Sequence, residues 1–181
     1  MKASTMTLPI SPSQTIGPFS HEAWRWACAA TDALVSDANA NADVDAITIS
    51  GILRDGDGNP INDGMIEAWA PACVEAELSH ALPGFRRVAS DDAGAFRITL
   101  PRPGAPGEPA TLITIFARGL VLHQFTAVFL GDDAGLADST MLQQVPAERR
   151  ATLIAKKVGP ADYQWNIWMQ GEQETVFFDY E

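Results

Sequence analysis

From residue 46 onward, hydrophobic and polar positions alternate in short runs, which is typical of strands with one buried face. The run AITISGILR at residues 46–54, for example, places Ile47 and Ile49 on the same side. The pattern predicts seven or eight short strands, at residues 46–54, 64–70, 85–90, 95–100, 111–118, 125–130, 163–170 and 175–179. Turn residues separate the strands, as in DGDGNP at 55–60 and DDAG at 91–94.

Many short strands joined by such turns predict an all-β fold, and we expect a β-sandwich of the transthyretin-like type at residues 46–181. Residues 1–45 form a different region, in which Pro9, Pro12 and Pro18 exclude a regular helix and predict an extended N-terminal arm. An alanine-rich segment at 21–34 predicts one short helix or a few turns, and residues 146–155 predict a helical turn. We expect the region 1–45 to form an interface.

Composition and charge exclude several classes of function for this chain. The chain has 181 residues, 46% hydrophobic and 19% charged, which suits one folded domain. Its 23 acidic and 12 basic residues give a net charge of −11, which disfavours nucleic acid and anionic membrane surfaces as partners. We also expect no membrane span and no secretion signal. Cys28 and Cys73 predict two buried free thiols and not a disulfide framework, so we expect a cytoplasmic protein.

Five motifs keep their order nearly from one end of the chain to the other, and together they resemble the intradiol ring-cleavage dioxygenases, in particular the alpha subunits of protocatechuate 3,4-dioxygenases. They are SQTIGPF at 13–19, the hairpin at 51–69 that ends in EAW, FARGL at 116–120, PAERRATLIAK at 146–156 and QGEQETVFFD at 170–179. In the last motif Gln173 stands where the family has glycine. The resemblance implies an intradiol dioxygenase-type sandwich.

The metal ligands of that family are missing here. The resemblance implies a ferric site of two tyrosines and two histidines, the histidines forming a His-x-His pair on one strand. Residues i and i+2 share a face of a strand, so such a pair can hold one ion. This chain has Ala110 and Leu112 at the two positions, and neither can bind a metal. We therefore expect no metal site in this chain, and Fe(III) on a homologous beta subunit.

Arg118 is the first candidate substrate-binding residue. It ends an apolar run, where a buried cation needs an anionic partner. The resemblance implies that Arg118 lines the substrate pocket at the subunit interface, whereas the residues alone leave an internal salt bridge open as the alternative. For Thr15, Gly17 and Pro18, the resemblance implies that the arm forms part of the partner's pocket wall, and the alternative is a plain tail.

The implied activity is intradiol cleavage of 3,4-dihydroxybenzoate by O2 to 3-carboxy-cis,cis-muconate by a hetero-oligomer of alpha–beta pairs. This chain would supply pocket walls and charge, contribute no catalytic residue and be inactive alone. Two alternatives remain at this point. One is a stand-alone transthyretin-like binding or scaffold module without catalysis, since fold alone does not decide function. The other is a self-sufficient metalloenzyme whose ligands come from distant residues.

Overall fold

The computed structural model of the chain describes residues 26, 28, 45–78, 82–103 and 105–179. The arm positions Thr15, Gly17 and Pro18 lie outside the described residues, as does most of the predicted helix at 21–34. Trp26 and Cys28, the two described positions of that helix, are both helical. The division into an arm at 1–45 and a sandwich at 46–181 therefore stays a prediction.

Strands dominate the described part of the chain, as the alternating pattern predicts. The described residues form nine, namely β1 (Ala46–Arg54), β2 (Met65–Trp69), β3 (Phe85–Ala89), β4 (Ala95–Pro101), β5 (Thr111–Phe116), β6 (Gln124–Leu130), β7 (Ile154–Lys157), β8 (Asp162–Gln164) and β9 (Ile167–Trp168). Within residues 45–179, the described helical elements are short: η1 (Pro71–Cys73), η2 (Glu75–Glu77), η3 (Leu136–Asp138), α2 (Thr140–Gln143) and η4 (Arg150–Leu153). The all-β fold class is confirmed.

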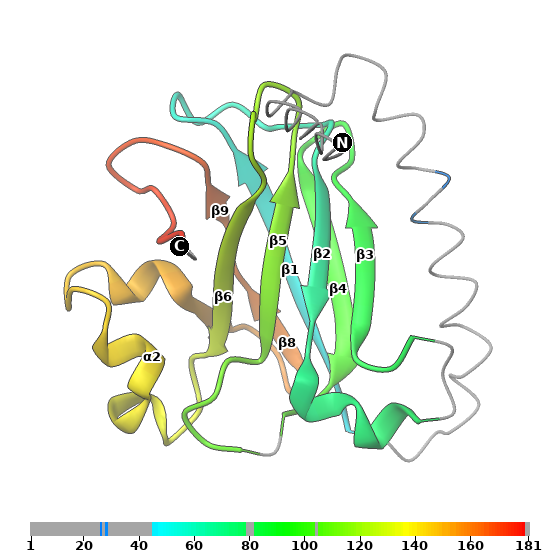
Figure 1. The fold of residues 1–181 in the computed structure, drawn as a ribbon, viewed down its shortest axis with the longest axis vertical. Coiled ribbons are helices and arrows are strands. Elements are labelled where there is room, and N and C mark those ends of the chain that lie inside the picture. The colour runs from blue at the N-terminus through cyan, green and yellow to red at the C-terminus, as the bar shows by residue number, and fades with distance from the viewer. Residues whose placement is uncertain (1–25, 27, 29–44, 79–81, 104, 180–181) are drawn as a thin grey trace, which may run out of the picture.

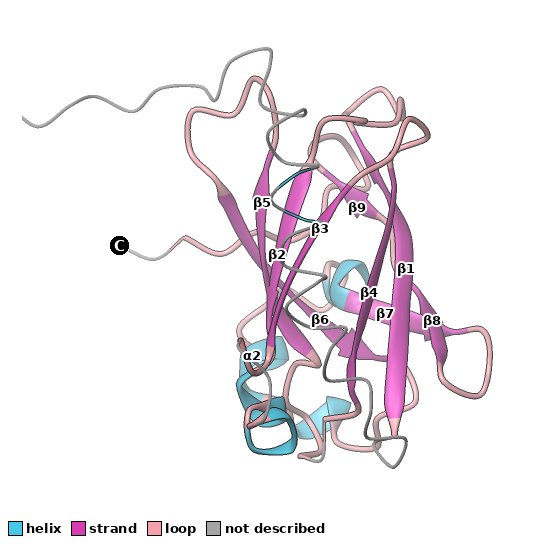
Figure 2. Ribbon diagram, turned by 90° about the vertical axis from the view of Figure 1, so that its right-hand side faces the viewer, coloured by secondary structure: helices cyan, strands magenta, loops and turns pink. Residues whose placement is uncertain are grey.

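The strands form one curled sheet in the order β3-β2-β5-β6-β7-β8-β1-β4, with β9 pairing β1 beside β8. Figure 1 and Figure 2 show the resulting two layers, β3-β2-β5-β6 in one and β4-β1-β8 in the other. Neighbours are antiparallel except β6–β7, β1–β8 and β1–β9, which run parallel. The chain reaches β7 from β6 through the segment of η3, α2 and η4, which lies outside the first layer.

Two hydrophobic clusters hold these parts together. The larger lies between the layers and contains the inward residues of both, among them Ile47, Ile66 and Ile113. The smaller lies between the outer side of β6 and the helical segment, where Phe129 packs with Leu142 and Leu153. Apolar residues therefore occupy both faces of β6, in agreement with its near-continuous hydrophobic sequence.

The strand predicted at 163–170 is divided into β8 and β9 by a close approach at Gly51. A Cβ on Gly51 would lie 1.6 Å from the backbone oxygen of Trp165, so only glycine fits there. Beside it, the Ile52 N–H donates to the side-chain oxygen of Asn166 at 3.0 Å, in place of a backbone acceptor. This hydrogen bond to the Asn166 side chain interrupts the backbone pairing with β1 between β8 and β9.

Two predicted elements are wrong in detail. Residues 175–179 form no strand, only a single bridge between Phe178 and Phe125. The reason is that threonine hydroxyl groups, and not a neighbouring strand, bond to the backbone of Val176. Val176 accepts from the Thr126 hydroxyl at 2.7 Å and donates to the Thr152 hydroxyl at 3.2 Å. The helical turn predicted at 146–155 shrinks to the 3-10 helix η4, and its last residues begin β7, since Ile154 and Ala155 pair with β6.

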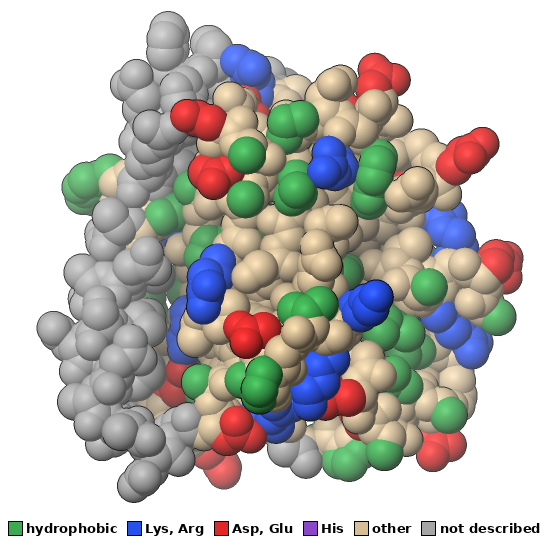
Figure 3. Space-filling model, turned by 180° about the vertical axis from the view of Figure 1, so that it is seen from behind, with side chains coloured by type: hydrophobic (Ala, Val, Ile, Leu, Met, Phe, Trp, Pro, Cys, Tyr) green, Lys and Arg blue, Asp and Glu red, His purple; other side chains and the backbone are tan. Residues whose placement is uncertain are grey.

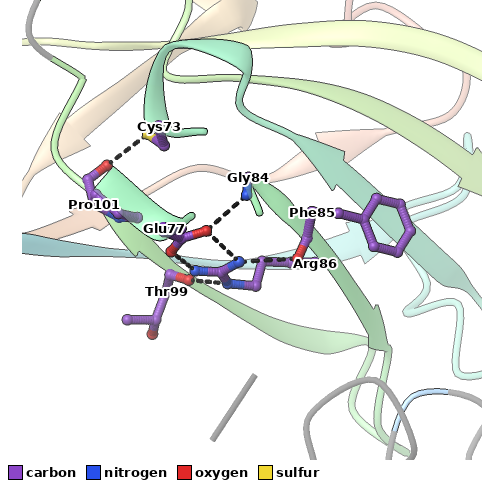
Figure 4. Close-up of polar contacts among 7 residues, drawn as sticks. All are labelled: Cys73, Glu77, Gly84, Phe85, Arg86, Thr99 and Pro101. Carbon is purple, nitrogen blue, oxygen red and sulfur yellow. Dashed lines mark hydrogen bonds and ion pairs between the residues drawn. The ribbon is translucent and has the colours of Figure 1, made fainter. Parts of the chain in front are cut away.

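A buried ion pair fixes the segment of η1 and η2 to the end of the sandwich (Figure 4). The Arg86 guanidinium contacts both carboxylate oxygens of Glu77 and donates from Nε to the Thr99 carbonyl at 2.8 Å. The Gly84 N–H also donates to Glu77, at 2.7 Å. Because Arg86 lies on β3 and Thr99 on β4, this cluster connects strands at the two ends of the sheet order.

Candidate functional site

The candidate site begins where β5 ends, at the FARGL motif. The strand was predicted to reach Arg118 but ends at Phe116. Three residues later the chain turns at Gly119, whose φ of 92° belongs to the left-handed region. Arg118 therefore leaves the apolar run, and its side chain is 58% exposed. The expectation of a buried cation at the end of this apolar run is wrong, because the turn directs Arg118 towards solvent.

Asp63 is the partner of Arg118. β2 and β5 are antiparallel with Met65 opposite Phe116, so continuing this register beyond both strands places Asp63 opposite Arg118. The Asp63 Oδ2 atom lies 3.0 Å from Arg118 Nε, and the Asp63 side chain is only 10% exposed. The internal salt bridge that the sequence left open is present. A role of Arg118 towards substrate stays a prediction, since most of its side chain faces outward.

An apolar rim follows Arg118 in the loop to β6. Val121 and Leu122 are both exposed. His123 is exposed too, and its ring lies between Phe116 and Phe125, with ring centroids 5.5 and 4.5 Å away. Its environment is that of a surface histidine stacked on aromatic rings. One cation, one buried carboxylate and several apolar side chains thus gather at this end of the first layer.

The outer face of the first layer is also rich in apolar residues. The strand register places alternate residues on this face, where the Glu67–Arg87 ion pair is surrounded by apolar groups. Five of its large apolar residues are not fully buried: Trp69, Phe85, Leu112, Phe116 and Phe125. Trp69 is exposed, and the other four are partly buried. The opposite side of the molecule differs. Figure 3, seen from behind, shows acidic and basic side chains interspersed with small apolar groups on the side of β1 and β4. The first layer is therefore the better candidate for a protein interface.

The two positions of the missing His-x-His pair lie in apolar surroundings. Ala110 is buried in the core between the layers, and Leu112 packs against the second cluster, on β6 and the helical segment. Neither offers a donor atom to iron, so the residues present do not fit a metal there. Within the described residues, no group of three or more His, Cys, Asp or Glu side chains could hold a metal ion. His21, His80 and Tyr180 lie outside those residues.

Tyr163 is engaged in a structural network at the other end of the sandwich. Its hydroxyl donates to Asp132 at 2.8 Å and accepts from Arg102 at 2.8 Å. Lys157 donates to Asp132 at 2.7 Å, and this hydrogen bond is the main cause that lowers the pKa of Asp132 and raises that of Lys157. Since Tyr163 is buried and bonded on both sides, it closes the sandwich and is not offered to a ligand.

Sequence reasoning found Arg118 but missed Asp63. Asp63 stands in a loop sequence, IND at 61–63, which reads as ordinary turn chemistry. Its place opposite Arg118 follows only from the pairing of β2 with β5, which joins segments some fifty residues apart. The signal lies in the register of two strands and not in any local motif.

Comparisons with solved structures show which fold the chain shares with known proteins. The dioxygenase domain of a carbohydrate-binding fusion protein from Streptomyces matches with a TM-score of 0.54 at 14% identity, over 73% of this chain and 84% of that one. Hydroxyquinol 1,2-dioxygenase from Pseudomonas putida matches with a TM-score of 0.53 at 20% identity, over 72% of this chain and 58% of the other. The fold is that of the intradiol ring-cleavage dioxygenases.

Sequence relatives then give the particular family. The protocatechuate 3,4-dioxygenase alpha chain of Burkholderia cepacia is 34% identical over an alignment of 197 positions, which covers 96% of this chain and 98% of the relative. The alpha chain of Pseudomonas putida is 33% identical with the same coverage. None of the protein-family models matches. The chain belongs to the family of protocatechuate 3,4-dioxygenase alpha chains, which confirms the resemblance in the motifs and does not favour a stand-alone scaffold.

Proposed function

We propose that this chain is the iron-free subunit of a heteromeric enzyme that cleaves 3,4-dihydroxybenzoate with O2 to 3-carboxy-cis,cis-muconate. Its partner is a homologous beta subunit that carries Fe(III). The observation that carries the proposal is the relationship to alpha chains over the whole length, in a chain whose Ala110 and Leu112 offer no metal ligand. When bound in the partner, ferric iron would hold the catechol oxygens and make the ring reactive towards O2.

The part of this chain is to shape and charge the pocket. Arg118 ends the FARGL segment as a mostly exposed cation beside the apolar rim of Val121 and Leu122. A guanidinium stays charged at all working pH values and presents a planar fork that matches a carboxylate. We place it against the substrate carboxylate, where the partner's surface would exclude water and strengthen the contact.

The arm makes the second contribution. Gly17 lets a backbone approach a ligand closely, and Pro18 keeps the chain extended at low entropic cost. We propose that Thr15, Gly17 and Pro18 form part of the pocket wall on the partner. Gly17→Val would add a side chain at the closest approach, and it should lower kcat/KM while the two subunits still assemble.

The assembly consists of alpha–beta pairs, and the outer face of β3-β2-β5-β6 is the proposed contact surface. Its large apolar residues support this choice over the mixed surface behind. We place the enzyme in the cytoplasm, which the buried thiol of Cys73, a cysteine outside any disulfide, supports. No helix in the described part of the chain is long and apolar enough to cross a membrane.

The test compares the chain alone with the chain co-expressed with a beta-type partner. Alone, it should bind no stoichiometric iron and cleave no 3,4-dihydroxybenzoate. The co-purified pair should contain iron, consume O2 with this substrate and lose activity when the subunits are separated. About one ferric ion on the isolated chain, with turnover, would refute the proposal. So would a beta subunit that is equally active without this chain.

A further inference from the structure

Asp63 is a nearly buried carboxylate whose one ion pair joins it to an exposed cation. Its side chain is 10% exposed, and Oδ2 accepts no hydrogen bond from the described residues. The N–H group of Arg118 Nε lies close to Oδ2 but does not point along a hydrogen bond, so the contact is electrostatic. A carboxylate held out of water needs a nearby positive charge. The attraction of Asp63 therefore restricts the Arg118 guanidinium to positions beside this carboxylate.

Among the described residues, Asp63 pairs with Arg118 on one side of the guanidinium only. The contact is made through Nε, the nitrogen nearest the aliphatic stem. In the described part of the chain, no other group pairs with Arg118, and a Cβ on the neighbouring Gly119 would have nothing within 4 Å. The terminal nitrogens Nη1 and Nη2 carry four N–H groups, which suit an anion that binds end-on.

Asp63 has two opposite effects on an anion at Arg118. Its negative charge repels the anion, which by itself weakens binding. It also restricts a long side chain that would otherwise sample many rotamers, which strengthens binding because less freedom is lost on association. The repulsion is reduced because the guanidinium lies between the two anions, so we expect the restriction to dominate.

We infer that Asp63 is a positioning residue, which holds Arg118 so that its terminal nitrogens face the carboxylate of a carboxylated catechol. The inference rests on the proposed function and adds to it a residue that determines specificity. It acts on the carboxylate end of the substrate, so catechols without a carboxylate should not depend on it.

The test uses the assembled alpha–beta enzyme with Asp63→Asn, which keeps the size of the side chain and removes its charge. Steady-state kinetics are measured with 3,4-dihydroxybenzoate and with catechol. Asp132→Asn is the matched control, because it removes a carboxylate from a Lys157 ion pair at the opposite end of the sandwich. If the amide does not assemble, Asp63→Ser is measured in its place with the same expectation.

Loss of positioning should raise KM for 3,4-dihydroxybenzoate about tenfold in Asp63→Asn, with kcat much less affected. The kcat/KM for catechol should stay within about twofold of wild type, as should both substrates in Asp132→Asn. A lower KM for 3,4-dihydroxybenzoate would mean that repulsion dominates and would overturn the inference. Equal losses with both substrates would do the same, since they indicate a structural role. Failure of the proposed function is distinct, because the wild-type complex would then be inactive.

Discussion

Arg86 and Glu77 form a buried pair in which both terminal nitrogens of the arginine contact the carboxylate. Removing one partner leaves the other buried and uncompensated, which costs about 3–5 kcal/mol. Glu77→Gln should therefore lower the free energy of unfolding by about that amount, measured by urea denaturation of the purified chain. The double variant Glu77→Leu with Arg86→Met should recover most of the loss. A single-variant loss below about 1 kcal/mol would contradict a strongly desolvated pair.

Cys73 lies beside this pair and should be unreactive in the folded chain. Burial, with a smaller contribution from Glu77, raises the pKa of the Cys73 thiol to about 11. Its hydrogen is also engaged, since Sγ donates to the Pro101 carbonyl at 3.2 Å. In a Cys28→Ser background, a thiol reagent at pH 8 should label Cys73 only after unfolding by urea. Labelling of the native chain within minutes would show that the thiol is accessible.

How far the sequence predicts the fold depends on whether a segment is governed by its own pattern. β1 was predicted to the residue because AITISGILR alternates and a glycine-rich turn follows it. β7 was missed because PAERRATLIA has helical composition, while Ile154 and Ala155 are held as a strand by pairing with β6. Residues 175–179 have strand composition, yet Thr126 and Thr152 bind their backbone. In both failures tertiary partners override local preference.

The same distinction applies to the candidate site. Arg118 was found because a charge after an apolar run stands out, and because FARGL resembles a known family. Its exposure and its contact with Asp63 were not predicted, since they depend on where β5 ends and on the register with β2. The contributions of Thr15, Gly17 and Pro18 stay predictions from the resemblance.

The Asp132–Lys157 pair predicts a particular pH dependence of stability. The hydrogen bond from Lys157 lowers the pKa of Asp132, so its stabilisation is present above the unfolded pKa of about 4 and is lost as pH falls through the lower folded value. The pKa of Lys157 is raised, so its share is present below about 10.4 and is lost as pH rises through the higher folded value. Wild type and Asp132→Asn should therefore differ most between about pH 5 and 10. Urea denaturation across this range measures the difference, and a gap that persists unchanged at pH 2 would contradict the assignment.

Arg118→Ala should destabilise the chain even though Arg118 is mostly exposed. The substitution leaves the Asp63 carboxylate buried without its cation, which should lower the free energy of unfolding by about 1–3 kcal/mol. Asp63→Asn with Arg118→Ala should recover that loss, because no buried charge remains. Arg97→Ala is the matched control. Among the described residues, this exposed arginine on β4 makes a 3.4 Å contact with the Thr48 hydroxyl, and its loss should change stability by less than about 0.5 kcal/mol. The activity of the assembled enzyme separates the two roles of Arg118, since KM for 3,4-dihydroxybenzoate should stay high in the double variant although its stability returns. If stability and KM recover together, Arg118 acts only through the fold.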